Sequence, residues 1–428
     1  MMFKALSALL VLSSVALAAE RTVSPKEIAS AAAQAKAGDT IVIADGDYRD
    51  VVINFKAKGT AEKPITLRAQ TPGKVKFEGD YQLTIDGEHL VVSGLFFGES
   101  KSEKDVIEIR GIENRVTDCA IVALNRGGKW IHFMPLAQRC RLDHCYIEGH
   151  APKDVRLQVE VDEKTPPEHR IDHNHFAHRP PLGENGGETM RLGYSYQSMF
   201  VSRTTVEDNL FTQCDGEIEI ISSKSCENVY RHNTFRDCEG TLTLRHGNRC
   251  VVDGNFFFGN GGGDGAKKTG GVRVIGEDHK IVNNYFEKTA GIAGGVIALT
   301  AGIPDSELKG YWQIRKCLVA NNVFVDNDAP CLLLDAGYNE RHRTLLPEKV
   351  TIENNTFVAP KTNAKPFVRG MVGLGFKWGG NVGSGAPRGD APAVGFKIVD
   401  HVEPPKVGTP IDEGVVGPSW KRVGRPAR

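Results

Sequence analysis

Two glutamates, Glu217 and Glu219, lie two residues apart in DGEIEII (215–221), a segment of alternating strand residues. Residues two apart in a strand point to the same face, about 6–7 Å from each other, so both carboxylates project outward while Ile218 and Ile220 point inward. Two carboxylates at this separation repel each other unless a cation neutralises them. A hard cation such as Ca²⁺, which prefers several oxygen ligands, suits this arrangement.

Residues near this acidic pair favour a cation site over the commoner outcome for Glu-x-Glu, a solvated acidic face. The preceding segment NGGETMRLG (185–193) supplies two more oxygen donors, Asn185 in a turn and Glu188 at the start of a strand. The register of the repeating unit described below brings this segment next to the acidic pair.

Two basic residues, Lys224 and Arg245, follow the acids in successive copies of one unit, DGEIEIISSKSCENVYRHNTF (215–235) and EGTLTLRHGNRCVVDGNFFF (239–258). Lys224 precedes the asparagine that closes its copy by nine residues, and Arg245 precedes its own by ten. A lone lysine or arginine is usually a surface charge. Here the two side chains nearly superpose on adjacent copies beside an acidic pair, which predicts a site for an acidic polymer.

This combination suits the removal of a weakly acidic proton from the carbon next to a carboxylate. A cation that neutralises the carboxylate stabilises the enolate-like intermediate. A lysine crowded by a cation and an arginine gives up its own proton more readily, so Lys224 can act as the base. Arg245 can stabilise the departing oxygen. The expected reaction is β-elimination in a uronic-acid polymer, which leaves an unsaturated uronate at the new end.

A repeat determines the fold that carries these residues. Asn-x-Phe or a related triplet recurs at intervals of 22–38 residues, and such spacing is typical of a solenoid. The first positions of the triplets are Gly94, Cys119, Cys145, Asn174, Asn209, Asn233, Asn255, Asn284, Asn322 and Asn355. Short alternating runs rich in Val, Ile, Thr and Phe predict an all-β, single-domain right-handed parallel β-helix. Each asparagine should bond to the coils above and below, and the residue two places on should fill the interior.

Two other folds fit less well. A doubly wound α/β fold needs long amphipathic helices between its strands, and a leucine-rich repeat needs a Leu-x-x-Leu-x-Leu signature; neither pattern is present in the sequence.

The ends of the chain suggest export and capping. Residues 1–19 have the basic Lys4, an apolar stretch and a small-residue cleavage site, which predicts a signal peptide and a secreted or periplasmic protein. We expect a β-helical catalytic domain over 20–365, opened by a short capping helix within Pro25–Lys36, with irregular final coils and a tail of the same domain over 366–428. No later apolar run is long enough for a transmembrane helix.

The net charge limits the kinds of partner that the chain is expected to bind. The formal net charge is zero, with 53 basic and 53 acidic residues, so we expect no binding to nucleic acid or membranes and no obligate protein partner.

Of the nine cysteines, Cys214 and Cys238 are 24 residues apart, or one coil. A buried cysteine ladder is the favoured interpretation, and a disulfide stays open.

At these residues the chain resembles polysaccharide lyase family 6, which contains alginate lyases and chondroitinase B. The resemblance rests on three segments: NGGETMRLG (185–193), the block 217–248, and GGVRVIG (270–276). It implies a right-handed parallel β-helix and Ca²⁺-assisted elimination, with Lys224 as the base and Arg245 as the acid. Alginate is the expected substrate and dermatan sulfate the alternative. Some family members carry a second β-helical domain, for which this chain is too short.

The resemblance also implies ligands and substrate contacts. Asn185, Glu217 and Glu219 would be the calcium ligands, with Glu188 as a fourth. His246 and Arg273 would bind the substrate, and Arg191 would assist.

Two functions from other classes make different demands. A β-helical pectin hydrolase would need paired aspartates that activate water, and Asp215 and Asp237 are the candidates. A noncatalytic sugar-binding solenoid would need aromatic platforms, for which Tyr311 and Trp312 are available.

Overall fold

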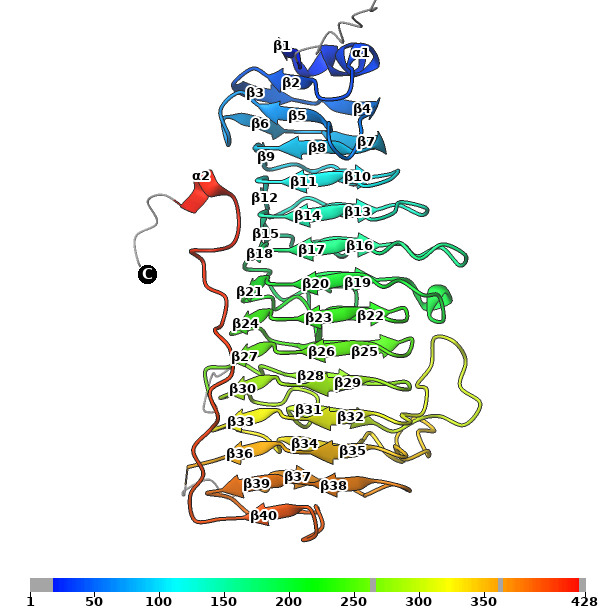
Figure 1. Cartoon of the computed structure of the whole chain (residues 1–428), viewed down its shortest axis with the longest axis vertical. Helices are drawn as coiled ribbons and strands as arrows, with labels where there is room; N and C mark the ends of the chain where they lie inside the picture. Colours follow the sequence, from blue (N-terminus) through cyan, green and yellow to red (C-terminus); the bar gives the residue numbers. More distant parts are fainter. Residues whose placement is uncertain (1–17, 262–266, 361–364, 423–428) are drawn as a thin grey trace, which may run out of the picture.

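The computed structural model describes residues 18–261, 267–360 and 365–422. These residues form three long parallel sheets, which we name A, B and C, wound into one stack of coils (Figure 1). This confirms the predicted parallel β-helix. Most of the predicted signal peptide lies outside the described residues.

Each coil contributes one strand to each sheet in most of the stack. Sheet A contains β1 (Glu20–Val23), β2 (Thr40–Ile43), β5 (Ile65–Ala69), β8 (Leu90–Ser93), β11 (Arg115–Thr117), β14 (Arg141–Asp143), β17 (Arg170–Asp172), β20 (Thr205–Glu207), β23 (Val229–Arg231), β26 (Val251–Asp253), β29 (Lys280–Val282), β32 (Leu318–Ala320), β35 (Thr351–Glu353) and β38 (Lys377–Gly379). Sheet B contains β3 (Gly46–Arg49), β6 (Val75–Glu78), β9 (Leu95–Phe97), β12 (Ala120–Ala123), β15 (Tyr146–Gly149), β18 (His175–Phe176), β21 (Leu210–Thr212), β24 (Thr234–Arg236), β27 (Phe256–Phe258), β30 (Tyr285–Glu287), β33 (Val323–Val325), β36 (Thr356–Val358), β39 (Asn381–Ser384) and β40 (Phe396–Ile398). Sheet C contains β4 (Val52–Lys58), β7 (Gln82–Glu88), β10 (Ile107–Ile109), β13 (Ile131–Phe133), β16 (Leu157–Val159), β19 (Met190–Leu192), β22 (Glu219–Lys224), β25 (Thr241–His246), β28 (Val272–Val274), β31 (Ile297–Thr300), β34 (Leu332–Ala336) and β37 (Val368–Arg369).

The Asn-x-Phe repeat is a scaffold, as predicted. The backbone N–H of Asn233 donates to Oδ1 of Asn255 in the next coil (2.9 Å), and the Asn233 side chain donates to the carbonyl of Val206 in the coil before (2.8 Å). The phenylalanines stack in the bore with ring centroids 4.6–5.0 Å apart. The stacked rings are Phe176, Phe211, Phe235, Phe257, Phe286, Phe324 and Phe357. These two ladders fix coil register and hold sheet C in place.

The N-terminal end of the bore is covered by a short helical segment, as expected (Figure 1). A 3₁₀ turn, η1 (Pro25–Glu27), leads into α1 (Ile28–Gln34), and the buried face of α1 joins the hydrophobic core. The backbone N–H of Ser24 donates to Glu27 Oε2 (2.9 Å) in a capping box that begins this segment. Within the described ranges, no helix is long and apolar enough to cross a membrane.

After β40 the chain runs back along the stack and ends in α2 (Ser419–Arg422) (Figure 1). A second 3₁₀ turn, η2 (Ser195–Gln197), lies between β19 and β20. The returning segment is held by backbone donors: Ile411 to the Thr234 hydroxyl (2.8 Å) and Gly417 to the His173 carbonyl (2.9 Å). These contacts lie away from sheet C.

The nine cysteines are all buried and unpaired. The backbone N–H of Cys214 donates to Sγ of Cys238 one coil on (3.4 Å), so these side chains form a ladder in the interior. This agrees with the favoured sequence interpretation.

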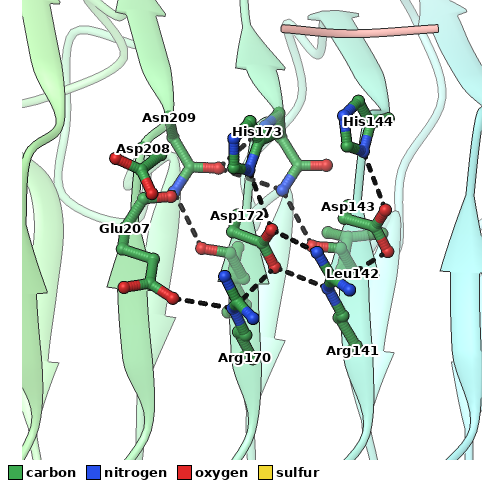
Figure 2. Close-up of polar contacts among 12 residues, drawn as sticks. Arg141, Leu142, Asp143, His144, Arg170, Asp172, His173, Glu207, Asp208 and Asn209 are labelled. Atoms are coloured by element: carbon green, nitrogen blue, oxygen red, sulfur yellow. Dashed lines mark hydrogen bonds and ion pairs between the residues drawn. The ribbon is translucent and has the colours of Figure 1, made fainter. Parts of the chain in front are cut away.

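Sheet A carries a row of alternating arginines and acids on successive coils, shown in Figure 2. Arg141 donates two hydrogen bonds to Asp172 (2.8 and 2.6 Å), and Arg170 Nε lies 2.7 Å from Glu207. The Asp172 side chain is fully buried and also contacts His173 Nδ1 (2.9 Å). Because these carboxylates are shielded from water and paired with forked guanidinium donors, the row should contribute to stability.

Asp143 offers a test of this row. Its fully buried carboxylate accepts two hydrogen bonds from Arg115 (2.7 and 2.6 Å). Burial opposes its ionisation, but the hydrogen bonds from Arg115 and His144 outweigh burial and hold the pKa of Asp143 well below its usual range. We expect Asp143→Asn to lower the free energy of unfolding by about 3 kcal/mol at neutral pH, because it leaves the arginine without its charged partner.

The stability that Asp143 contributes should depend on pH. Because the folded-state pKa is lowered, the contribution of Asp143 is complete above the unfolded-state pKa of about 3.9 and declines as the pH falls below it. Urea denaturation of wild type and Asp143→Asn should therefore show a smaller difference at about pH 3 than at pH 7. Equal differences at both pH values would contradict this account.

Candidate active site

The predicted site residues gather on the outer face of sheet C, in the middle of the stack. Parallel register aligns Arg191 on β19 with Ser222 on β22, Thr243 on β25 and Arg273 on β28. These strands run next to one another in Figure 1. Because register repeats from coil to coil, side chains distant in sequence become neighbours on one surface.

Two irregularities interrupt the pairing of β22 and β25. Lys224 pairs with His246, so Arg245 is the extra residue of a bulge, and Arg245 and His246 contact each other. A second shift lies between Glu219 and Ile221. Bulges re-aim side chains in this way and are frequent next to active sites.

The expectation that Ile218 and Ile220 both point inward is half wrong. Ile220 is buried in the core, but Ile218 is 38% exposed because it lies before β22 begins. The acids that flank Ile218 nevertheless lie close together.

Glu188, Glu217 and Glu219 form a compact acidic triad. One oxygen from each lies within 4.8 Å of the others. Oε2 of Glu188 and Oε1 of Glu217 are buried and lack a hydrogen-bond partner in the protein. Burial, followed by the charges of Glu188 and Glu219, raises the pKa of Glu217 to about 8. Crowded carboxylates that repel one another and keep two buried oxygens without a protein partner fit a hard divalent cation.

Asn185 lies at the rim of the triad. It is exposed and lines the same depression of about 410 Å³ as Glu217 and Ile218. The structure thus groups the three predicted glutamates tightly and places the predicted asparagine beside one of them.

Four basic side chains surround the triad, each only 14–17% exposed. Lys224 Nζ lies 3.8 Å from Glu188 Oε1, and Arg191 Nη1 lies 3.5 Å from the same atom. Around Glu219, Arg273 Nη1 lies 3.3 Å and Arg245 Nε 3.8 Å from Oε1. Lys224, the predicted base, therefore lies beside Glu188, and Arg245, the predicted proton donor, lies beside Glu219.

His246 lies between these two basic residues and is electrically neutral at neutral pH. Burial, followed by the charges of Arg245 and Lys224, lowers the pKa of His246 to about 3. Arg245 Nη1 donates to His246 Nε2 (2.8 Å), while Nδ1 of the imidazole is buried without a protein partner. Nδ1 therefore carries the proton.

A long connection after β31 brings Tyr311 over the site, which the sequence suggested only as a sugar platform. Three guanidinium groups lie over its ring, those of Arg245 (4.6 Å), Arg343 (5.0 Å) and Arg273 (5.7 Å). The Tyr311 hydroxyl accepts from Arg273 Nη2 (3.2 Å), and the neighbouring Gly310 carbonyl accepts from Arg245 Nη1 (2.8 Å). Tyr311 thus orders the positive side of the site.

Arg191 is held in a similar way at the other side of the site. Its Nε donates to Gln158 Oε1 (2.7 Å) on β16, and its guanidinium lies 4.9 Å from the ring of Tyr194. All the predicted substrate-binding residues therefore have fixed orientations around the triad.

Comparison with known proteins agrees with the geometry. Residues 22–381 match the sequence profile of the chondroitinase B family. The alginate lyase AlyGC of polysaccharide lyase family 6 superposes with a TM-score of 0.87 at 34% identity, over 95% of this chain but 60% of that one.

Two other family 6 structures match along nearly their whole length. A mannuronic-acid-specific lyase from human gut microbiota gives a TM-score of 0.77 at 28% identity, over 94% of this chain and 96% of that one. Pedsa3628 from Pseudopedobacter saltans gives 0.77 at 25% identity, over 94% and 99%. No curated protein matches the chain by sequence. From the profile match and these superpositions, we conclude that the chain belongs to the chondroitinase B family, within polysaccharide lyase family 6.

Proposed function

We propose that this chain is a polysaccharide lyase that cleaves alginate by β-elimination and uses Ca²⁺. The observation that carries the proposal is the placement of Lys224 and Arg245 on either side of a buried acidic triad, 3.8 Å from Glu188 and 3.8 Å from Glu219. Alginate is favoured because AlyGC, at 34% identity, is an alginate lyase. Dermatan sulfate is the competing substrate, because the matching profile is named for chondroitinase B.

The proposed reaction proceeds through this chain's side chains as follows. Neutral Lys224 takes the proton from C5 of the uronate, beside its carboxylate. The electron pair of that C–H bond forms a C4–C5 double bond, and the bond from C4 to the glycosidic oxygen breaks. The guanidinium of Arg245 stabilises the departing oxygen, which takes up a proton from solvent and becomes the hydroxyl of the shortened chain, while Lys224 returns its proton to solvent.

The remaining residues bind and orient the sugar acids. Ca²⁺ held by Glu188, Glu217 and Glu219, with Asn185 nearby, would neutralise the substrate carboxylate and make the adjacent proton more acidic. Arg273 and Arg191 offer forked donors for neighbouring carboxylates. Neutral His246, which accepts a hydrogen bond from Arg245, leaves proton transfer to Lys224.

A hydrolytic mechanism finds less support. Asp215, one of the two candidate aspartates, is buried and engaged through both oxygens, by Lys267 Nζ (2.5 Å) and the backbone of Glu239 (2.8 Å). An acid held in this way is buried in a structural ion pair and is poorly placed to activate water.

The test is ultraviolet absorbance during incubation of the purified protein with alginate, dermatan sulfate and pectate in parallel. We expect absorbance to rise on alginate, because each elimination creates a conjugated unsaturated uronate. A rise only on dermatan sulfate would keep the mechanism and replace the substrate. No rise on any polymer would contradict the proposed function.

Tyr311 gives a prediction specific to this site. We expect Tyr311→Ala to raise KM for alginate about tenfold with a smaller change in kcat, because three arginines lose an aromatic surface worth about 0.5–2 kcal/mol. Tyr311→Phe is the matched control, since it keeps the ring and loses only the hydrogen bond from Arg273. Steady-state kinetics should rank wild type and Tyr311→Phe close together. A larger effect for Tyr311→Phe on kcat would instead assign the hydroxyl a chemical role.

A further inference from the structure

We propose that Arg179, a fully buried residue beneath the acidic triad, is a positioning residue that sets the geometry of the cation site. Its guanidinium donates through Nη1 to the backbone carbonyl of Glu188 and through Nη2 to that of Asp154, both at 2.5 Å. One fork thus ties the segment that carries Glu188, just before β19, to the preceding coil. This inference rests on the proposed cation site.

Arg179 also fixes the approach to Glu217. Its backbone N–H donates to Gln213 (2.9 Å), and its carbonyl accepts from Asp215 (3.0 Å), two residues before Glu217. The same residue therefore holds the backbone leading into two of the three triad acids from below.

A pair of glycines makes room for this arrangement. Gly187 directly precedes Glu188, and Gly216 directly precedes Glu217. A Cβ on either glycine would collide with the carbonyl of the other, and a Cβ on Gly216 would also meet Arg179 Nε at 2.5 Å. The segments before β19 and β22 approach each other closely because neither glycine has a side chain, and Arg179 lies directly under that contact.

The charge of Arg179 also acts on the triad. Glu188 and Glu217 interact electrostatically with the buried guanidinium. A fixed positive charge below three crowded carboxylates offsets part of their mutual repulsion, so the acids can stay together before a cation binds. Residues that orient ligands without touching the metal typically change metal affinity by about 10–100-fold when replaced.

Arg156 provides a matched comparison one coil earlier. It is equally buried, and its guanidinium donates only to backbone carbonyls, those of Ile147, Gly149, Ala177 and His178. None of these carbonyls belongs to a triad acid. Replacing Arg156 should therefore disturb the fold to a similar degree without reaching the cation site.

The experiment compares Arg179→Lys with Arg156→Lys in the full chain. Calorimetric titration with Ca²⁺ gives the Kd, and thermal unfolding with Ca²⁺ and with chelator gives the Ca²⁺-dependent shift in Tm. We expect Arg179→Lys, which keeps the charge but loses the forked donation, to weaken Ca²⁺ binding about tenfold or more and to shrink the Tm shift. Arg156→Lys should lower Tm equally in both conditions and leave the Kd unchanged.

Two results would overturn the inference. One is an unchanged Ca²⁺ Kd in Arg179→Lys; the other is an equal loss of affinity in both variants, which would mark a general packing effect. If Arg179→Lys does not fold, Gly216→Ala is the second variant, and it should weaken Ca²⁺ binding in the same way. Wild-type protein that cleaves alginate and binds Ca²⁺ normally would leave the proposed function intact whichever way these variants behave.

Discussion

Lys224→Ala is expected to reduce the rate of alginate cleavage about 10²–10⁴-fold, the range that loss of a general base usually produces. The lysine is largely buried, and its ammonium nitrogen lies 3.8 Å from Glu188, so it is held rather than free to sample solvent. Its partner in register is His246, which burial and neighbouring charges keep neutral and whose pKa is lowered to about 3. His246 is therefore a poor substitute base, and little activity should survive.

The informative control is Lys224→Arg. Arginine keeps the positive charge and can still pair with Glu188, but it does not lose its proton in the working pH range. If Lys224 only attracts the polyanion, Lys224→Arg should retain most activity. If Lys224 is the base, both variants should be nearly inactive in initial-rate measurements, while replacement of the exposed Lys280 on sheet A has no effect.

The double variant Glu217→Gln/Glu219→Gln is expected to lower activity at least about 10²-fold, the scale of losing a main electrostatic stabiliser. Amides preserve the shape of the side chains but remove two of the three charges that would hold a cation. The same loss should follow chelation of wild-type protein and should reverse when Ca²⁺ is restored.

Although this double variant should lose activity, its thermal stability should not fall. Burial and, after it, repulsion from Glu188 and Glu219 raise the pKa of Glu217. With chelator present, the double variant should therefore unfold at a Tm equal to or above that of wild type, and Ca²⁺ should raise the Tm of wild type only. Glu108→Gln, on the outer face of sheet C at β10, is the control. An active double variant, or chelator-resistant wild type, would remove the cation from the mechanism.

The fold was predictable because its repeat is local. The Asn-x-Phe triplets indicate both the asparagine hydrogen-bond ladder and the phenylalanine stack. The predicted glutamates lie together because they occupy similar places on neighbouring coils. The ion pairs on sheet A were not predicted, although RLD (141–143) and RID (170–172) repeat a basic residue two places before an acid. We did not anticipate that those carboxylates would be fully buried, because burial depends on how neighbouring coils stack.

The details of the site were harder to predict, for two physical reasons. Bulges shift register by one residue, so Ser223 pairs with Leu244 but Lys224 with His246, and no sequence pattern marks where such a shift falls. Tyr311 reaches the site through a long connection, and such loops have no periodicity to read. The 38-residue gap between Asn284 and Asn322 was the available signal that an insertion could fold over the site.

Cleavage of alginate in water enriched in heavy oxygen, followed by mass spectrometry of the products, tests the central claim most directly. Elimination breaks the bond between C4 and the glycosidic oxygen without consuming water. Products should therefore carry an unsaturated uronate at the new non-reducing end and no heavy oxygen introduced at cleavage. Saturated products with one heavy oxygen per broken bond would show hydrolysis and contradict the role assigned to Lys224 and Arg245.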